Sequence, residues 1–117
     1  MRVGLLGLCA ALLLAPLPPA LAGVCQTPGN VAAGDALYHQ TCVTCHGEDG
    51  HGVHAGTPDF TSGVMAYSTA SLFAHIKNGF HAPGRIAAMP PKGNNPALTD
   101  DDIRNLIAYL RHRFGCG

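Results

Sequence analysis

The clearest pattern of apolar and polar positions predicts a helix close to the C-terminus. Thr99 suits the position before a first helical turn, and Asp102, three residues later, completes the pattern of a capping box. Five apolar residues then recur at helical spacing and form one stripe: Ile103, Leu106, Ile107, Leu110 and Phe114. Gly115 offers a stop. We therefore predict a helix between Thr99 and Gly115, and we interpret the aspartates 100 to 102 as capping residues rather than metal ligands.

Two further helices are predicted upstream. One covers Val31–Gln40, where Gly34 would permit the close approach of another helix. The other covers Thr69–Asn78, has Gly79 at its end, and carries an apolar face made of Leu72, Phe73 and Ile76. No segment alternates as a strand, and the stretches 47–62 and 80–95 are rich in Gly, Pro and His, which is typical of loops. The pattern indicates an all-α protein.

The N-terminal residues read as a targeting segment. Arg2 is followed by an apolar run to Ala15, three prolines and the small-residue sequence Ala20-Leu21-Ala22. A membrane anchor is the alternative, but an apolar stretch interrupted by prolines falls short of the ~20 residues that a spanning helix needs. We predict that residues 1–22 are a cleavable secretory signal peptide, that residues 23–117 form one domain without a membrane span, and that this domain lies in the periplasm.

The sequence Cys42-Val43-Thr44-Cys45-His46 has the spacing of a covalent haem-attachment site. Two thiols at this spacing can add to the two vinyl groups of one porphyrin, and the adjacent imidazole becomes a ligand of the iron. The alternatives are a redox dithiol, half of a zinc site, or two buried thiols. The following histidine argues against a dithiol, and the chain has no second Cys-x-x-Cys pair for zinc.

Composition changes this picture in two ways. The chain has no Trp and only 6% aromatic residues, so a haem would supply much of the core that a domain of this size needs. The formal net charge is +0, so no basic surface suggests nucleic acid.

Two cysteines remain near the ends of the mature chain, Cys25 and Cys116. We predict a disulfide between them, worth about 4 kcal/mol; two free thiols or an intermolecular bridge are the alternatives.

Several segments together carry a family resemblance. They are Gly34-Asp35-Ala36-Leu37-Tyr38 before the Cys-x-x-Cys-His motif, Ile76-Lys77-Asn78-Gly79, Ala88-Met89-Pro90-Pro91-Lys92-Gly93, and Leu98-Thr99-Asp100 before Ala108-Tyr109-Leu110. Over most of residues 30–114 the chain resembles class I c-type cytochromes, and the Met-Pro-Pro-Lys-Gly stretch is most similar to the small bacterial c5-type subgroup. The resemblance implies three main helices around one covalently bound haem c. It also implies that the first and last helices cross, with Gly34 and Tyr38 against Tyr109.

The resemblance assigns the iron ligands. His46 would be the proximal ligand, and Met89, in a loop stiffened by two prolines, would be the sixth ligand; a thioether there favours reduced iron. In the family the second nitrogen of the proximal histidine bonds a backbone carbonyl just after a proline, which Pro58 and its neighbour Asp59 would supply here. Met65 is interpreted as a packing residue. A second histidine ligand, from His75 or His81, is the alternative to Met89.

Two strong axial ligands predict a one-electron carrier rather than an enzyme. Its partners would be donor and acceptor proteins that bind transiently. Three alternatives stay open: a haem protein with an open or displaceable sixth position, a haem subunit of a larger oxidoreductase, and a domain without haem. The sequence names neither redox partner and leaves the oligomeric state open.

Overall fold

The computed structural model describes residues 14, 15 and 27–116 of the 117-residue chain. The predicted signal peptide, apart from residues 14 and 15, and Cys25 lie outside the described residues. Both the domain boundary at residue 22 and the Cys25–Cys116 pairing therefore stay predictions. Within the described ranges, no helix is both long enough and apolar enough to span a membrane.

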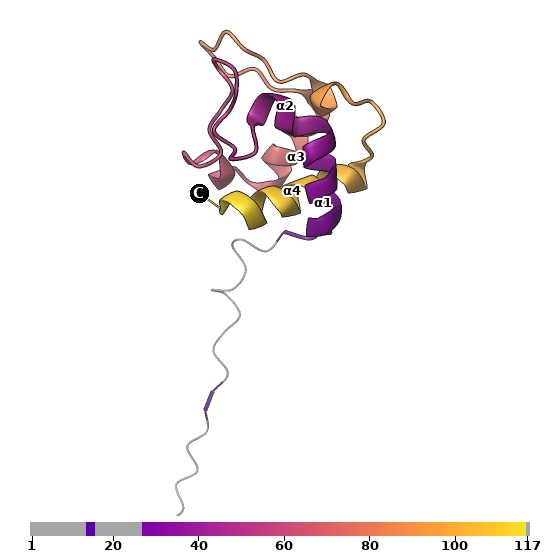
Figure 1. The fold of residues 1–117 in the computed structure, drawn as a ribbon. Coiled ribbons are helices and arrows are strands. Elements are labelled where there is room, and N and C mark those ends of the chain that lie inside the picture. The colour runs from indigo at the N-terminus through magenta and orange to yellow at the C-terminus, as the bar shows by residue number, and fades with distance from the viewer. Residues whose placement is uncertain (1–13, 16–26, 117) are drawn as a thin grey trace, which may run out of the picture.

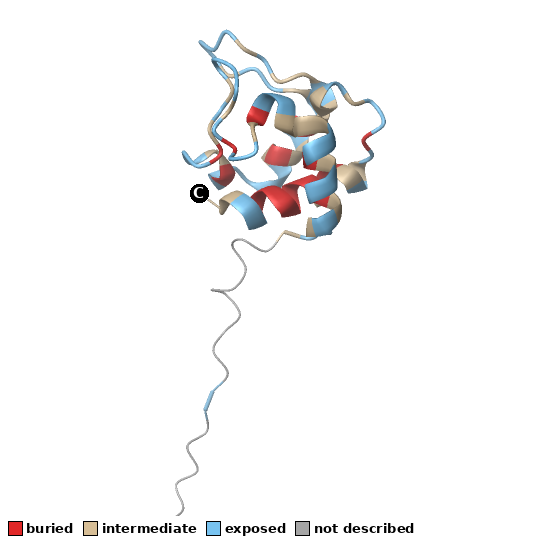
Figure 2. Ribbon diagram, in the orientation of Figure 1, coloured by how far each residue is buried: buried red, intermediate tan, exposed pale blue. Residues whose placement is uncertain are grey.

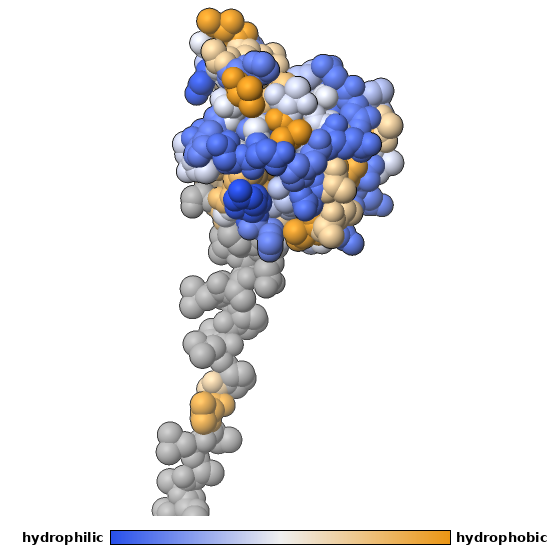
Figure 3. All heavy atoms as spheres, in the orientation of Figure 1, coloured by the Kyte–Doolittle hydropathy of each residue, from blue (hydrophilic) through white to orange (hydrophobic). Residues whose placement is uncertain are grey.

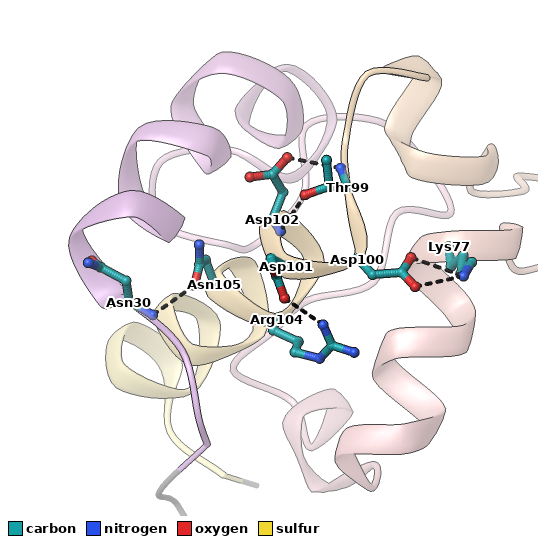
Figure 4. A network of polar contacts seen from close by, with 8 residues as sticks. All are labelled: Asn30, Lys77, Thr99, Asp100, Asp101, Asp102, Arg104 and Asn105. Carbon is teal, nitrogen blue, oxygen red and sulfur yellow. Dashed lines mark hydrogen bonds and ion pairs between the residues drawn. The ribbon is translucent and has the colours of Figure 1, made fainter.

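Helix α4 (Asp100–Phe114) is the central element of the fold (Figure 1). Its capping box forms as the sequence predicts: the Asp102 backbone N–H donates to Thr99 Oγ1 at 3.1 Å, and the Thr99 N–H donates to Asp102 Oδ2 at 2.9 Å (Figure 4). Figure 2 shows the buried positions gathered along this helix. The predicted apolar stripe supplies much of the core, with Ile103, Leu106, Ile107 and Leu110 all buried.

Helix α1 (Val31–Leu37) crosses α4 at Gly34, and no side chain separates the two backbones. A Cβ atom added to Gly34 would lie 2.6 Å from the Asn105 carbonyl carbon and 2.7 Å from Tyr109 Cβ. The Tyr38 and Tyr109 rings pack beside this point, with centroids 5.2 Å apart. Asn105 also accepts a hydrogen bond from the Asn30 backbone N–H at 2.8 Å (Figure 4). The predicted crossing of the first and last helices is confirmed.

The helical path does not end where the sequence predicts. Instead of stopping near Gln40, it widens into one π-helical turn, η2 (Tyr38–Cys42), and continues as α2 (Val43–His46). The wide turn is marked by the Val43 N–H, which bonds the Tyr38 carbonyl. Insertions of this kind often mark functional sites in helices. Here the turn carries the chain directly into the Cys-x-x-Cys-His motif.

Helix α3 (Thr69–Asn78) has the predicted bounds and begins with Ser68, whose side chain accepts from the Ser71 N–H. Its buried residues, Leu72 and Ile76, join the core, and the Lys77 ammonium lies 2.9 Å from Asp100 at the start of α4 (Figure 4). Two short 3₁₀ turns, η3 (Val64–Ala66) and η4 (Pro91–Asn94), lie within the loops. The described residues contain no strand, only one antiparallel bridge between Phe80 and Met89. The fold is the predicted all-α class.

Candidate haem site

The three residues of the attachment motif share one face of the helical segment. Cys45 and His46 follow Cys42 by three and four residues, the spacing that places side chains side by side on a helix. Both cysteines are free thiols; Cys42 is partly buried against the core and Cys45 is exposed. Burial, reinforced by the neighbouring Cys45, raises the pKa of Cys42 to about 11. Because a redox-active dithiol needs a thiol of lowered pKa, this environment argues against that alternative.

The backbone after the motif folds back over the end of α2. The Gly52 N–H donates to the His46 carbonyl and the Val53 N–H donates to the Cys45 carbonyl, each at 2.9 Å. The Tyr38 hydroxyl, fully buried, donates to the Gly47 carbonyl at 2.6 Å. These bonds satisfy carbonyl groups that a helix end leaves without partners. They fix the position of His46 from both sides.

The His46 side chain is buried, with only 8% of its surface exposed. Burial lowers the pKa of His46 to about 4, so the imidazole is neutral near pH 7, which is the form that binds iron. Its Nδ1 atom is buried and has no hydrogen-bond partner in the structure. The predicted bond to a carbonyl at Pro58 or Asp59 is therefore wrong. The Asp59 carboxylate lies instead against His51 Nδ1, at 2.9 Å, and Thr61.

The ring of His46 stacks on Phe60, with centroids 4.5 Å apart and 16° between the planes. Phe60 in turn packs on Phe114 near the end of α4, at 5.4 Å. Sequence reasoning missed Phe60 because it lies in a loop, 14 positions after His46. Its one signal is an aromatic residue two positions after Pro58, in a chain with few aromatic residues.

Met89, the predicted sixth ligand, lies in the second long loop and packs partly buried against the core. Its backbone is tied to Phe80 by two hydrogen bonds, Phe80 N–H to Met89 O at 3.0 Å and Met89 N–H to Phe80 O at 2.8 Å. Gly79 allows this pairing, because its φ is +80° and an added Cβ would lie 2.7 Å from the Met89 carbonyl oxygen. The loop also meets the motif segment, since the Asn95 side chain donates to Thr41 Oγ1 at 3.1 Å.

The rival ligands have other contacts. Met65 is 1% exposed within the core, which confirms its interpretation as a packing residue. The His75 ring stacks on Phe80, with centroids 3.8 Å apart, and meets the edge of Tyr67. His81 Nε2 lies 2.7 Å from the Arg85 carbonyl, and its side chain is exposed. The His75 ring is thus engaged by two aromatic rings, and the His81 ring by the Arg85 carbonyl.

The two long loops leave apolar surface uncovered. Val53 is 61% exposed and Ile86 is fully exposed, although both are large apolar residues. The loops touch each other at Gly56 and Ala87, and Figure 3 shows apolar residues at the tip of the molecule where they project. A neutral buried imidazole, two free thiols on the same helical face, and uncovered apolar loops together fit a covalently attached haem.

Comparison with known proteins agrees with this fit. The protein-family model described as "Cytochrome C oxidase, cbb3-type, subunit III" matches residues 29–110. The chain is 36% identical over 81 residues to cytochrome c-554(548) of Halomonas halodenitrificans, covering 69% of this chain and 93% of that protein. It is 32% identical over 91 residues to the cbb3-type cytochrome c oxidase subunit CcoP of Rhodobacter capsulatus, covering 75% of this chain but only 30% of CcoP.

Among solved structures, the c-type cytochrome XoxG of Methylobacterium extorquens AM1 is similar, with a TM-score of 0.56 and 27% identity over 72% of this chain and 50% of XoxG. The finer resemblance to the c5-type subgroup stays a prediction. The residues that the family model matches include α1, the Cys-x-x-Cys-His motif, the Met89 loop and most of α4. The chain belongs to the cytochrome c family and has the helical fold of the class I c-type cytochromes.

Proposed function

We propose that the protein is a periplasmic one-electron carrier with a single haem c, attached through Cys42 and Cys45 and ligated by His46 and Met89. The observation that carries the proposal is the environment of His46: a buried, neutral imidazole on the same helical face as two free thiols. A bound haem would supply a ferric–ferrous couple that accepts and returns one electron.

The residues of this chain are arranged to change little when the charge at the site changes. The hydrogen bonds to the Cys45, His46 and Gly47 carbonyls hold the proximal segment. The pair of backbone bonds between Phe80 and Met89 holds the other loop. A ligand framework that is fixed in advance reduces the rearrangement that each electron transfer requires.

The exposed apolar residues of the two loops indicate how partners would bind. Val53 and Ile86 project beside the site, and neither loop tip carries a dense cluster of one charge. Small, transient contacts with donor and acceptor proteins suit such a surface. The partners themselves are redox proteins in the same compartment.

The test uses protein matured in a bacterial periplasm that contains haem-attachment machinery. We expect a low-spin spectrum with the weak red band of a thioether bound to ferric iron. Met89→Leu should abolish that band, whereas the matched variant Met65→Leu should keep it, because Met65 is a core residue. Persistence of the band in Met89→Leu would show that another group ligates the iron. Rapid binding of carbon monoxide by the untreated ferrous protein would favour an open sixth position instead.

Two further measurements test location and cleavage. Fractionation of the expressing cells should find the haem protein in the periplasm. N-terminal sequencing should begin at Gly23 if residues 1–22 are removed as a signal peptide. Haem protein retained with an intact N-terminus in the membrane fraction would contradict both.

A second candidate function is that of a haem subunit in a larger oxidoreductase. The observation that favours it is the family description together with the likeness to CcoP, of which the chain spans 30%. Native purification from the source cells separates the two candidates. A free carrier would elute as an isolated small haem protein, whereas a subunit would co-purify at fixed stoichiometry with larger chains.

A further inference from the structure

The segment that follows the proposed ligand Met89 contacts the residue that precedes the attachment motif. The Asn95 side-chain amide donates to Thr41 Oγ1 at 3.1 Å, a partly buried bond between residues 54 positions apart. The two segments also meet through apolar atoms, because a Cβ added to Gly93 would lie 3.1 Å from Thr41 Cγ2. Thr41 lies in the π turn η2, directly before Cys42. We call these two contacts the Thr41 clamp.

The chain between Met89 and Asn95 is stiff enough to transmit a displacement. Two prolines follow Met89, and each fixes its own φ angle. Residues 92–94 then adopt left-handed φ values of 54°, 58° and 64°. This turn is closed by one backbone bond from the Gly93 N–H to the Pro90 carbonyl, at 3.1 Å, and by another from the Asn95 N–H to the first residue of the turn, at 3.0 Å. A movement of Met89 away from the iron would therefore carry Asn95 with it.

The left-handed turn needs support from its surroundings. Lys92 is not a glycine, and left-handed backbone is unfavourable for an ordinary L-residue, so the conformation persists only where contacts hold it. Gly79 holds one end of the segment, since an added Cβ would lie 3.0 Å from the Pro91 nitrogen. The Thr41 clamp holds the other end. Backbone outliers of this kind are concentrated at functional sites and ligand clamps.

We propose that Thr41 is a positioning residue for the sixth ligand: through Asn95, its hydroxyl holds the Met89 loop against the attachment segment and so limits the release of Met89 from the iron. This inference rests on the proposed function, because it requires Met89 to bind the iron. When Met89 leaves, the stiff segment moves Asn95 away from Thr41 and the bond breaks. The bond therefore stabilises only the state in which the loop is closed.

Imidazole added from solution measures how readily the loop opens. It binds the ferric iron only after Met89 has left, so its apparent affinity is proportional to the fraction of molecules in which the loop is open. Binding is followed in the haem-loaded protein by the loss of the weak red thioether band. A bond that supported the fold alone would change the denaturant midpoint and leave this affinity unchanged.

The experiment compares three variants in this titration. Thr41→Val removes the hydroxyl and keeps the size of the side chain, and we expect it to bind imidazole about fivefold more tightly, the change produced by the loss of one ordinary hydrogen bond. Thr41→Ser keeps the acceptor oxygen and should bind imidazole as the wild type does. Thr69→Val is the matched control: it makes the same change at an exposed position at the start of α3 and should leave the affinity unchanged.

A double-substitution cycle assigns the effect to the bond itself. Asn95→Ala removes the donor, but it also removes the bond that Asn95 Oδ1 accepts from the Ala97 N–H at 3.2 Å. The single variant therefore changes more than the clamp, and the cycle isolates the term shared with Thr41. In the Asn95→Ala background, Thr41→Val should change the imidazole affinity no further.

The outcomes separate the two proposals. The role of Thr41 would be overturned by an unchanged affinity in Thr41→Val, by an equal gain in Thr41→Ser or Thr69→Val, or by an undiminished gain in the Asn95→Ala background. In each of these cases the thioether band of the wild type would leave the proposed function standing. A wild-type protein without that band would refute the ligation by Met89 and both proposals with it. If Thr41→Val yields no haem protein, Thr41→Ala, which also lacks the hydroxyl, takes its place with the same expected gain.

Discussion

The crossing of α1 and α4 leads to the sharpest test of the fold, the substitution Gly34→Ala. In a helix without neighbours this change would add about 1 kcal/mol of stability, because alanine has the higher helix propensity. At the crossing, however, the new Cβ would lie 2.6 Å from the Asn105 carbonyl carbon and 2.7 Å from Tyr109 Cβ. Real side chains do not approach this closely, so the two helices must separate.

Overpacking of a core costs about 1–3 kcal/mol. We take the upper end, because the atoms nearest to the new Cβ are all backbone or Cβ atoms, which cannot rotate away. After the gain in propensity the net loss is about 2 kcal/mol, and for a domain of this size that lowers the melting temperature by about 8–16 °C. The assay is denaturant unfolding of the haem-loaded protein, followed by far-ultraviolet circular dichroism.

Ala36→Gly is the matched control in the same helix, since Ala36 is exposed and its change alters propensity alone. It should lose about 1 kcal/mol, and it calibrates the propensity term for Gly34→Ala. A Gly34→Ala protein as stable as the wild type, or more stable, would refute the reasoning: the helices could then not be in backbone contact at this position.

Two other predictions concern the segment around the motif. Tyr38→Phe should lower the free energy of unfolding by about 1 kcal/mol, because it removes the bond to the Gly47 carbonyl; an unchanged denaturant midpoint would contradict that bond. The hydrogen bond of His39 to the Asp35 backbone raises the pKa of His39 most, and the bond to Glu48 raises it further. The His39 side chain therefore stabilises the fold mainly when it is protonated. The advantage of wild type over His39→Gln should therefore be full below pH 6.5 and disappear as the pH rises through the raised pKa, and a difference that stays constant with pH would argue against the contact.

Features of the fold were predictable from the sequence where the residues that determine them lie close together in the chain. The bounds of α3 and α4 were predictable because their caps and stripes lie within a few residues of each other, as Thr99 and Asp102 illustrate. Gly34 was identifiable as a crossing point because the resemblance supplied its partner. The end of the first helix was not predictable, because the π turn starts at Tyr38 and the contacts of Tyr38 are not local. Its buried side chain packs on Tyr109 and donates a hydrogen bond to the Gly47 carbonyl.

The same distinction explains the site. The motif from Cys42 to His46 and the Met89 loop are short sequence patterns, so they could be assigned as candidates. The contact between His46 and Phe60 joins a helix end to a loop residue, and it depends on how residues 47–59 fold between them. The predicted hydrogen bond from His46 Nδ1 to a carbonyl at Pro58 or Asp59 is absent for the same reason, since the geometry of the loop determines which atom faces the imidazole.

The distribution of aromatic residues connects the fold to the proposed function. The chain has only four Phe and three Tyr. Four of them form one connected cluster behind His46: Tyr38, Phe60, Tyr109 and Phe114. Two more, Tyr67 and Phe80, contact the His75 ring next to the antiparallel bridge that holds Met89. Flat, stiff side chains have few rotamers, so they hold a neighbour's position at little cost in entropy. Their concentration beside both proposed ligands is what a carrier requires, because an iron whose ligands stay in place changes oxidation state with the least rearrangement.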